Sequence, residues 1–199
     1  MLTNRDYWLL CRKGSNRMLY PDGAKSLNSG SDTGYITQID GEFIIVIDGT
    51  SSLHEWLENI LVKKVAPYAA ARGFSDPCLA FVDQIIKELG CHSSKVTVVG
   101  HSRGGAIAQI IALYLIDLGF GASVITFGSP RIGGMRFYSH CTQRRLKHLR
   151  IYIENDVVCN LPKNRWFSGF MHYQTAVVAL PHIKGMSIKT RHLSYGERL

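Results

Sequence analysis

A serine flanked by glycines lies in the segment Gly100-His101-Ser102-Arg103-Gly104, which has the pattern G-x-S-x-G. A β-branched run precedes the segment and an apolar stretch with helical spacing follows it, which predicts a strand, a sharp turn and a helix. Small residues beside the serine suit a strained turn, because β-carbons there would collide. Such a turn exposes the Ser102 hydroxyl as a nucleophile. It also sets the Arg103 N–H at a helix N-terminus, where it can face an oxyanion. A glycine-rich turn without chemistry is the alternative that this motif alone leaves open.

A serine hydroxyl attacks a carbonyl only when a base takes its proton and a carboxylate orients that base. In α/β-hydrolases, where the serine sits on such a turn, the chain order is serine, acid, histidine. The carboxylates after Ser102 are Asp117, Glu154, Asp156 and Glu197. Asp117 falls inside a predicted helix, Glu154 is still in the tail of a predicted strand, and Glu197 follows every histidine. We therefore predict Asp156, just past the end of that strand, as the acid; an ordinary turn aspartate is the alternative.

Three of the eight histidines, His172, His182 and His192, follow Asp156 and are candidates for the base. Their order along the chain does not rank them. His101 is adjacent to the serine, so its side chain is expected to point away from that of the serine and to have a structural role.

The elements that must position these residues are predicted from the apolar pattern. Runs 35–39 and 42–47 are joined by Asp40-Gly41, which is typical of a tight hairpin. The second run is nearly all apolar, so we expect it to be buried on both faces of a central sheet. It leads into Asp48-Gly49-Thr50-Ser51-Ser52, whose composition alone indicates no more than a capped strand-to-helix turn.

The rest of the chain alternates between strands and helices. We expect a helix opened by Ser75-Asp76-Pro77, with Leu79 in its buried stripe, and a largely buried helix after Ser102. Further strands are expected at 123–127, 149–153 and 175–180, and a short helix near 135–141. This alternation predicts the α/β class, with a mostly parallel sheet covered by helices on both faces. Segment 57–74 is either a lid over the site or a packed connection.

Length and composition set the broader class. The 199 residues, 46% hydrophobic and 19% charged, suit one domain over 1–199, and residues 1–30 read as an irregular segment with one short helix near 6–10. The net charge of +8 favours anionic lipid surfaces or nucleic acid, but no nucleic-acid module with stacking aromatics is present. The longest apolar region, 106–127, is interrupted by Asp117, Gly119 and Gly121, which argues against a transmembrane segment.

The five cysteines are odd in number and lack C-x-x-C spacing. We therefore expect reduced thiols, with neither a disulfide framework nor a zinc site. The N-terminus lacks the features of a signal peptide, so a cytoplasmic location is expected by default, with export that needs no N-terminal signal as the alternative.

Several motifs, in order, resemble the class 3 lipases of the fungal triacylglycerol lipase type, over about residues 33–199. They are Asp48-Gly49-Thr50-Ser51-Ser52, 100–105, 126–133, 154–158 with Leu161-Pro162, and His192 with Tyr195. The resemblance implies an α/β-hydrolase fold and a catalytic triad of Ser102, Asp156 and His192. It also implies oxyanion N–H groups from Thr50 and Arg103, with no metal or cofactor, and makes His172 a non-catalytic histidine.

Several positions depart from the family pattern, among them Cys159 and Asn160, which stand where the acid loop is often proline-rich. Asp48 stands where arginine is common, and Arg103 stands where leucine is common. A backbone N–H does not depend on its side chain, so the oxyanion hole is expected to survive at Arg103. The guanidinium is left to act either on the substrate or in packing. The region before the hairpin is also shorter than in the secreted fungal members, and any lid within 57–74 is small.

The expected function is that of a serine hydrolase that cleaves carboxylic esters of lipids through an acyl-enzyme. A phospholipase A1 or a small-ester carboxylesterase would use the same triad, and the positive charge favours the former if the lipid surface is anionic. A non-catalytic lipid-binding or interaction module on the same fold is the alternative of another class.

Overall fold

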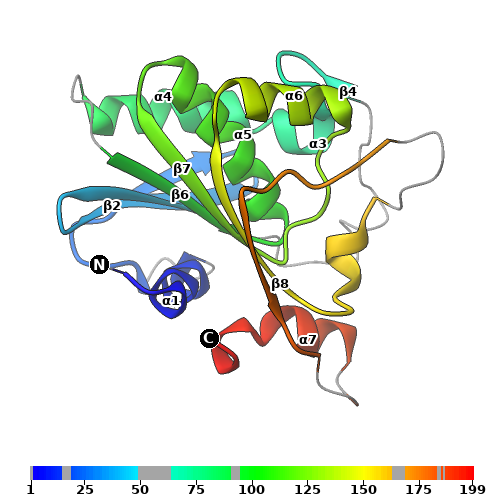
Figure 1. Ribbon diagram of the computed structural model, residues 1–199. Helices are drawn as coiled ribbons and strands as arrows, with labels where there is room; N and C mark the ends of the chain where they lie inside the picture. Colours follow the sequence, from blue (N-terminus) through cyan, green and yellow to red (C-terminus); the bar gives the residue numbers. More distant parts are fainter. Residues whose placement is uncertain are drawn as a thin grey trace.

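A mixed sheet of seven strands forms the centre of the computed structural model, in the order β1-β2-β3-β6-β7-β8-β9 (Figure 1). The structure describes residues 2–14, 19–48, 64–90, 95–162, 169–182, 185 and 187–199. Within them the sheet consists of β1 (Lys25–Ser29), β2 (Asp32–Ile39), β3 (Glu42–Ile47), β6 (Lys95–His101), β7 (Gly121–Phe127), β8 (Lys147–Ile153) and β9 (Ala176–Leu180). A separate small hairpin pairs β4 (Lys64–Val65) with β5 (Ala70–Ala71). The helices are α1 (Asn4–Gly14), α3 (Arg72–Ser75), α4 (Cys78–Leu89), α5 (Arg103–Asp117), α6 (Met135–Gln143) and α7 (Ile188–Leu193), with 3-10 turns η2 (Val157–Asn160) and η3 (Tyr195–Glu197).

The sheet is mostly parallel, as predicted. Strands β3, β6, β7, β8 and β9 pair in parallel, and β1 and β2 join β3 as an antiparallel edge. Ile47 at the end of β3 lies opposite Gly100 of β6, and His101 lies opposite Phe127 of β7. The segments that follow these strands therefore leave the sheet at one common edge, where ligand sites of open α/β sheets form.

The predicted hairpin joins β2 and β3. Asp40 and Gly41 both have positive φ values, 51° and 77°, which the tight turn requires. Residues Ile44 to Ile47 are all buried, because β3 is an interior strand with helices on both of its faces.

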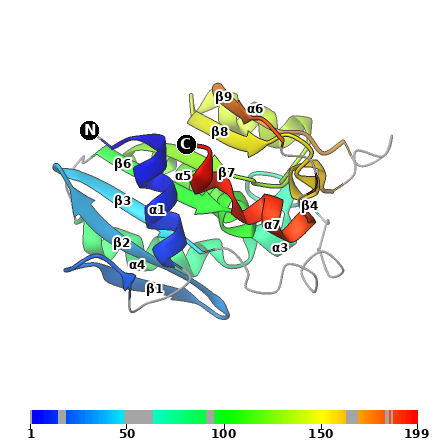
Figure 2. The same cartoon turned by 90° about the horizontal axis from the view of Figure 1, so that it is seen from below.

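Two layers of helices cover the sheet. Ile45 and Ile47 of β3 belong to a core cluster with α4 and α5, whereas Ile44 and Val46, which point to the opposite face, cluster with α1. Figure 2 shows α1 lying across that second face. Helix α5, buried along most of its length, packs against β6 and β7.

The N-terminal segment is more regular than predicted. The irregular stretch expected over 1–30 contains α1, 11 residues long, and the edge strand β1. Thr3 and Asp6 cap the start of α1 reciprocally, with the Thr3 N–H donating to Asp6 Oδ2 at 2.8 Å and the Asp6 N–H donating to Thr3 Oγ1 at 3.2 Å. In β1 only Leu27 is buried, so the strand has almost no apolar pattern and depends on its pairing with β2.

The start of α4 also differs from the prediction. The helix begins at Cys78 with Pro77 in the N-cap position and no side-chain cap, because Asp76 instead forms an ion pair with Arg72 at 3.1 Å. The buried stripe runs through Cys78, Phe81, Val82, Ile85 and Leu89, and Leu79 is 58% exposed. The prediction that Leu79 packs inward was wrong because the stripe includes its neighbour Cys78.

From Tyr68 on, segment 57–74 is a packed connection, whereas Lys64, Ala66 and Pro67 are exposed. Residues 57–63 lie outside the described residues, and 64–74 form the small hairpin and most of α3. The side chains of Tyr68, Ala71 and Phe74 are buried in the core cluster under α4 and α5. Residues 68–74 therefore do not form a lid.

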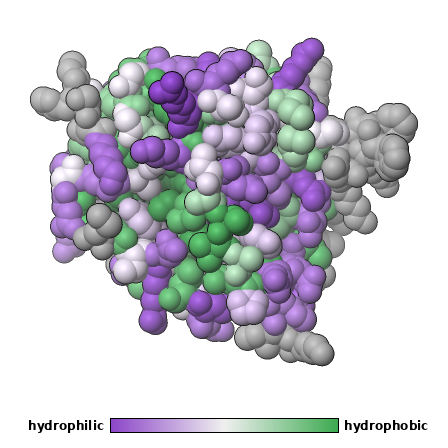
Figure 3. Space-filling model, in the orientation of Figure 1, coloured by the Kyte–Doolittle hydropathy of each residue, from purple (hydrophilic) through white to green (hydrophobic). Residues whose placement is uncertain are grey.

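The face of the molecule seen in Figure 3 is largely polar. Figure 3 shows hydrophilic residues over most of one face, around a hydrophobic area near its centre. None of the described helices has both the length and the apolar character needed to cross a membrane. Cys11, Cys78, Cys141 and Cys159 are buried free thiols, and Cys91 lies outside the described residues.

Candidate active site

Ser102 occupies a strained turn between β6 and α5. Its φ of 54° and ψ of −127° lie in a region that residues with a side chain rarely adopt, and it is 4% exposed. The glycines beside it let neighbouring backbone segments approach closely. A β-carbon on Gly104 would lie 2.3 Å from the carbonyl oxygen of Ile47, and one on Gly100 would lie 2.4 Å from the backbone of Gly104. The G-x-S-x-G pattern thus lets α5 begin directly against the ends of β3 and β6.

The backbone around Ser102 ties the turn to β7. The Ser102 N–H donates to the carbonyl of Phe127 at 2.9 Å, and the Gly105 N–H donates to the carbonyl of Ser102 at 3.1 Å. Arg103 is the first residue of α5, where backbone N–H groups have no acceptor within the helix. The turn therefore presents a hydroxyl and a helix N-terminus at the same edge of the sheet.

Asp156 follows β8 and accepts hydrogen bonds from three groups. Its Oδ1 accepts from the Val158 N–H at 3.0 Å, while its Oδ2 lies 2.7 Å from His192 Nδ1 and accepts from the Tyr195 hydroxyl at 3.0 Å. Burial alone raises the pKa of Asp156. The hydrogen bond to His192, the charge of that ring and the other two donors outweigh burial, and the net pKa lies below the ordinary value of 3.8. Asp156 is therefore a carboxylate at neutral pH.

His192 lies in α7 and is 2% exposed. Because the Asp156 carboxylate accepts, Nδ1 carries the proton, and in the neutral ring Nε2 then has a lone pair. Nε2 is buried and has no hydrogen-bond partner among the described residues. An oriented imidazole with an unused basic nitrogen is the arrangement that a general base requires.

His101 contacts this histidine from the end of β6. Its Nε2–H donates to the carbonyl of His192 at 2.8 Å, and the two rings lie 4.4 Å apart between centroids. Burial, followed by the charge of His192, lowers the pKa of His101 to about 3, so the ring is neutral. The edge of His101 packs against Trp8 of α1, with the ring centroids 5.1 Å apart. The residue next to the serine thus connects α1 to the backbone of His192.

Gly128 provides the space in which these groups meet. It follows β7 with a φ of 57°, and a β-carbon there would lie 2.7 Å from the Tyr195 hydroxyl and 2.9 Å from Cε1 of His192. Any side chain would therefore displace the two rings that contact Asp156. The position of Gly128 directly after a strand can be predicted from the sequence. Nothing in the sequence indicates which aromatic rings lie against it.

Of the three histidines that order alone left open, His192 contacts Asp156. His172 Nε2 lies 2.7 Å from the carbonyl of Cys159, to which it donates, and burial lowers its pKa to about 3. His182 follows β9, and within the described chain it has no hydrogen bond to the carboxylate of Asp156.

The side chains of Arg103 and Asp48, which depart from the family pattern, both contact neighbouring elements. The Arg103 guanidinium forms an ion pair with Asp32 of β2 and donates to the carbonyl of Gly73 in α3 at 3.0 Å. Asp48 is buried and accepts a hydrogen bond from the Thr33 hydroxyl. The contacts of the Arg103 guanidinium are those that the packing alternative predicts.

Thr50, the second predicted oxyanion residue, lies outside the described residues, as does the rest of 49–63. In the part of the chain that the structure describes, no three His, Cys, Asp or Glu side chains are grouped as a metal site.

Comparison with known proteins places this chain in a family. The family model described as Lipase (class 3) matches residues 44–166, more than half of the chain. Secreted mono- and diacylglycerol lipase 1 of Fusarium solani is 28% identical over 131 residues, which are 61% of this chain and 39% of that protein. A lipase of Rhizomucor miehei is 29% identical over 143 residues, 64% of this chain and 39% of that protein. A chloroplastic phospholipase A1 of Arabidopsis thaliana is 29% identical over 93 residues, 42% of this chain and 19% of that protein. The chain thus spans about two fifths of these relatives or less.

Solved structures agree on the fold. The Rhizomucor miehei lipase in complex with its propeptide superposes with a TM-score of 0.72 at 23% identity, covering 90% of this chain and 70% of that one. A triacylglycerol lipase from Penicillium expansum gives 0.76 at 18% identity, covering 89% and 77%. At these identities the likeness concerns architecture, and it confirms the predicted α/β-hydrolase fold.

Proposed function

We propose that this chain, which belongs to the class 3 lipase family, hydrolyses carboxylic esters of lipids through an acyl-enzyme. One observation carries the proposal. His192 Nδ1 lies 2.7 Å from the buried Asp156 carboxylate, and its Nε2 is unpartnered among the described residues. This pair lies beside the turn of Ser102, because the ring of His101, the residue before the serine, lies 4.4 Å from the His192 ring between centroids. Gly128, against the same ring, follows Phe127, whose carbonyl accepts from the Ser102 N–H.

In the proposed reaction His192 Nε2 takes the proton of Ser102 Oγ as that oxygen attacks the ester carbonyl carbon. The Arg103 N–H at the start of α5, with that of Thr50, stabilises the developing oxyanion. The imidazolium then donates that proton to the oxygen of the departing alkoxide. The alcohol leaves, and the acyl group stays bonded to Ser102 Oγ as an acyl-enzyme. Water activated by the same nitrogen releases the carboxylic acid and restores Ser102.

Neighbouring groups act as positioning residues in this scheme. The Val158 N–H and the Tyr195 hydroxyl hold the Asp156 carboxylate, and the lowered pKa of Asp156 keeps it charged opposite the imidazolium. His101 holds the backbone of His192. Each contact restrains the base in the orientation that proton transfer needs.

An apolar ester is the substrate class that the surroundings favour. Val157 and Leu193, adjacent in sequence to Asp156 and His192, are 38% and 43% exposed. The relatives by name include acylglycerol lipases and phospholipases A1. A phospholipase A1 activity is therefore the second candidate, favoured by the net charge of +8. The names of the relatives that carry a location give secreted, chloroplastic or chloroplastic and mitochondrial proteins, so the cytoplasmic location stays a prediction.

The test is ester hydrolysis by the purified protein. We expect turnover of a short-chain and a long-chain p-nitrophenyl ester and of an anionic phospholipid, and the ranking separates esterase, lipase and phospholipase. Ser102→Ala, Asp156→Asn and His192→Ala should each lower kcat by about 10⁴-fold or more, by analogy with measured triads.

His172→Ala is the matched control, because it removes a half-buried histidine outside the proposed triad. Activity that survives His192→Ala but not His172→Ala would show that His172, and not His192, is the base. A folded parent protein without activity on any ester, with lipid present, would instead favour the non-catalytic lipid-binding module.

A further inference from the structure

One arginine on β8 is buried without an acceptor for its N–H groups. Arg150 is 8% exposed, and its Nε is buried with no hydrogen-bond partner among the described residues. Nη1 has no partner there either and, unlike Nε, reaches the surface. Nη2 lies 3.2 Å from His172 Nε2, but that nitrogen donates to the carbonyl of Cys159 at 2.7 Å, so it cannot also accept from Nη2. A guanidinium with five donors therefore meets no acceptor in the part of the chain that the structure describes.

The charge of Arg150 also has no carboxylate opposite it. Its guanidinium carbon lies 4.2 Å from the centroid of the Tyr152 ring, and no described Asp or Glu forms an ion pair with it. The His172 ring is neutral, because burial and then the charge of Arg150 lower its pKa to about 3. Arginine is almost never buried unless it is paired, since an unmatched buried charge is costly. The geometry thus favours an anion that comes from outside the described chain.

A second arginine close by, Arg131, already has its acceptors. Its Nη1 donates to the carbonyls of Asn160 and Pro162 at 2.7 and 3.2 Å, and its Nη2 donates to Asn160 Oδ1 at 3.3 Å. The unmatched charge is therefore that of one guanidinium. One planar fork matches a singly charged group with two oxygens in a plane, which is a carboxylate.

Apolar surface lies beside this guanidinium, at the edge of the sheet. Figure 2 shows β9 next to β8, and β9 is the last strand in the order of the described sheet. Val177 is paired in register with Arg150, so it lies on the same face at one strand spacing, about 4.8 Å. Val177 is 52% exposed, and Ala179, opposite Tyr152, is exposed as well. A ligand that reaches Arg150 past this edge would lie over two apolar side chains.

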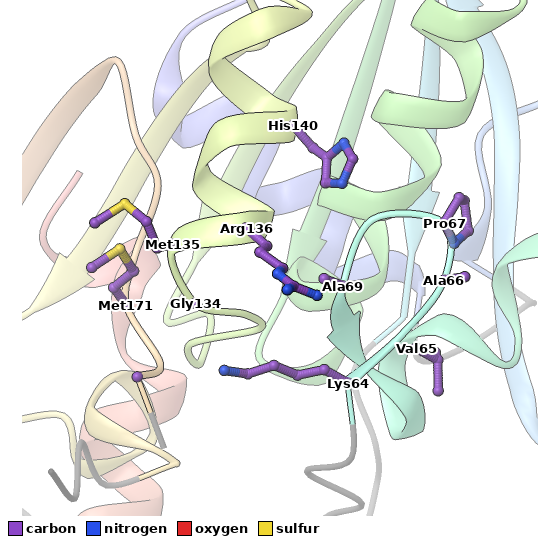
Figure 4. A pocket seen from close by; sticks show the side chains of 11 residues that line it. Lys64, Val65, Ala66, Pro67, Ala69, Gly134, Met135, Arg136, His140 and Met171 are labelled. Atoms are coloured by element: carbon purple, nitrogen blue, oxygen red, sulfur yellow. The ribbon is translucent and has the colours of Figure 1, made fainter. Parts of the chain in front are cut away.

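We propose that Arg150 binds the carboxylate of a fatty acid whose chain lies over Val177 and Ala179. The inference rests on the proposed function in one respect, that hydrolysis of a lipid ester at Ser102 would release such an acid. The site is distinct from the pocket between the β4–β5 hairpin and the start of α6, because Arg150 is not among the described residues that line that pocket (Figure 4).

The test measures binding without catalysis. Ser102→Ala protein is titrated in a calorimeter with octanoate, with acetate, which lacks the chain, and with octanol, which lacks the charge. We expect octanoate to bind at least about 10-fold more tightly than either, since chain burial and hydrogen bonds to a charged group each contribute that much. No binding of octanoate, or equal binding of octanol, would overturn the proposal. Inorganic phosphate that binds as tightly as octanoate would overturn the carboxylate as the ligand.

Arg150→Met, made in the same Ser102→Ala protein, removes the guanidinium and keeps an unbranched side chain. Octanoate binding should weaken at least about 10-fold. The matched control is Arg5→Met, at an exposed position on α1, which should change binding less than about twofold. Equal effects of the two substitutions would contradict the site.

Urea unfolding gives a second readout of Arg150→Met. Without ligand its unfolding midpoint should equal or exceed that of the Ser102→Ala protein, because an apolar side chain replaces a buried charge that has no partner. Octanoate should raise the midpoint only where Arg150 is present. A variant that unfolds at clearly lower urea, or fails to fold, would show that the guanidinium is paired within the protein and would refute the proposal.

Val177→Glu places a carboxylate of the chain itself beside Arg150. It should weaken octanoate binding at least about 10-fold more than Val177→Gln, which has the same length and no charge, because the new carboxylate occupies the guanidinium and repels the ligand. Equal octanoate affinity of the Glu and Gln variants would show that the ligand does not lie at Arg150.

The result for binding is independent of the result for hydrolysis. A parent protein that hydrolyses no ester, while octanoate binds to its Ser102→Ala variant through Arg150, would refute the hydrolase and leave the site supported. An active hydrolase whose octanoate binding is the same with and without Arg150 would refute the site alone.

Discussion

Asp156 is held by donors from three separate places in the chain: the Val158 N–H, His192 Nδ1 and the Tyr195 hydroxyl. The first belongs to the 3-10 turn that Asp156 itself caps, and the other two come from residues near the C-terminus. A carboxylate with three donors has little freedom to rotate, so the proton of His192 stays on Nδ1.

Tyr195→Phe should test this restraint. Losing one donor to Oδ2 raises the pKa of Asp156 toward its ordinary value and loosens the carboxylate, so we expect kcat to fall about 10-fold with KM little changed. Steady-state kinetics on a soluble ester measure the effect. Tyr138→Phe, at an exposed tyrosine, is the control. A raised KM at constant kcat would contradict a positioning role for Tyr195.

Arg103→Leu separates the side chain from the backbone at the proposed oxyanion hole. The substitution leaves Asp32, whose side chain is 14% exposed, without its guanidinium partner. The free energy of unfolding, measured with urea, should therefore fall by about 1–3 kcal/mol. Activity per folded molecule should stay within about threefold, since the N–H remains. Adding Asp32→Asn should recover part of the stability. A 100-fold loss of kcat in a stable protein would instead mean that the guanidinium acts on the substrate.

At the scale of elements, the start of α5 depends on its close approach to β3. Gly104→Ala would put a methyl group 2.3 Å from the carbonyl oxygen of Ile47. We expect a loss of about 3 kcal/mol or more in unfolding free energy and lower kcat, because α5 carries the Arg103 N–H with it when it shifts. Gly121→Ala, where nothing lies within 4 Å, is the control and should change stability by less than about 1 kcal/mol. Equal stability of the two variants in thermal unfolding would refute this packing argument.

Helix α1 shows how one element can support a site that it does not enter. Its Trp8 packs against the rings of His101, Phe127 and Tyr195 at centroid distances of 5.1 to 5.3 Å. Two of these rings contact His192 or Asp156. The helix therefore forms part of the support of the proposed base, although it lies at the other end of the chain.

At the scale of the whole molecule, three histidines with lowered pKa values should make stability depend on pH. Burial lowers the pKa of His101, His148 and His172 to about 3, whereas unfolded histidine titrates near 6.5. Between these values the unfolded state binds more protons, so stability falls as pH falls below about 6.5. Each histidine contributes a slope of about 1.4 kcal/mol per pH unit. Urea unfolding at several pH values from neutral to mildly acidic measures it.

His148 offers the cleanest variant, because it is 1% exposed and its Nε2 lies 2.8 Å from the Thr126 hydroxyl. His148→Gln keeps a group that can bond to the hydroxyl and removes one titrating site, so the slope should fall by one histidine's share. The Asp156 carboxylate, with a pKa below 3.8, titrates outside this range. An unchanged slope would show that His148 is not neutral in the folded protein.

Local patterns predicted much of this fold because they report local physics. The apolar run at 42–47 and the Asp40-Gly41 turn depend on burial and φ values of a few neighbouring residues, and the structure has both. Strand β1 was missed because its one buried residue, Leu27, is buried by β2 and α4 rather than by any pattern of its own. Leu79 was misplaced because helical spacing fits more than one buried stripe, and the neighbouring helix decides between them.

The amino-acid pattern alone was enough to predict the turn at Ser102, the parallel sheet around it and, through the order of the chain, Asp156 as the candidate acid. These follow from residues close together or from the direction in which strands end. Chain order left three histidines open, and the resemblance to class 3 lipases pointed to His192. The tertiary structure brings its ring to the Asp156 carboxylate, because the two residues are 36 positions apart and meet through the packing of α7. It also brings the Arg103 side chain to Asp32, and it places Lys64 of the β4–β5 hairpin and Arg136 of α6 in the lining of one pocket (Figure 4). Such contacts join side chains from separate elements, and their distances are set by how the helices and hairpin pack on the sheet.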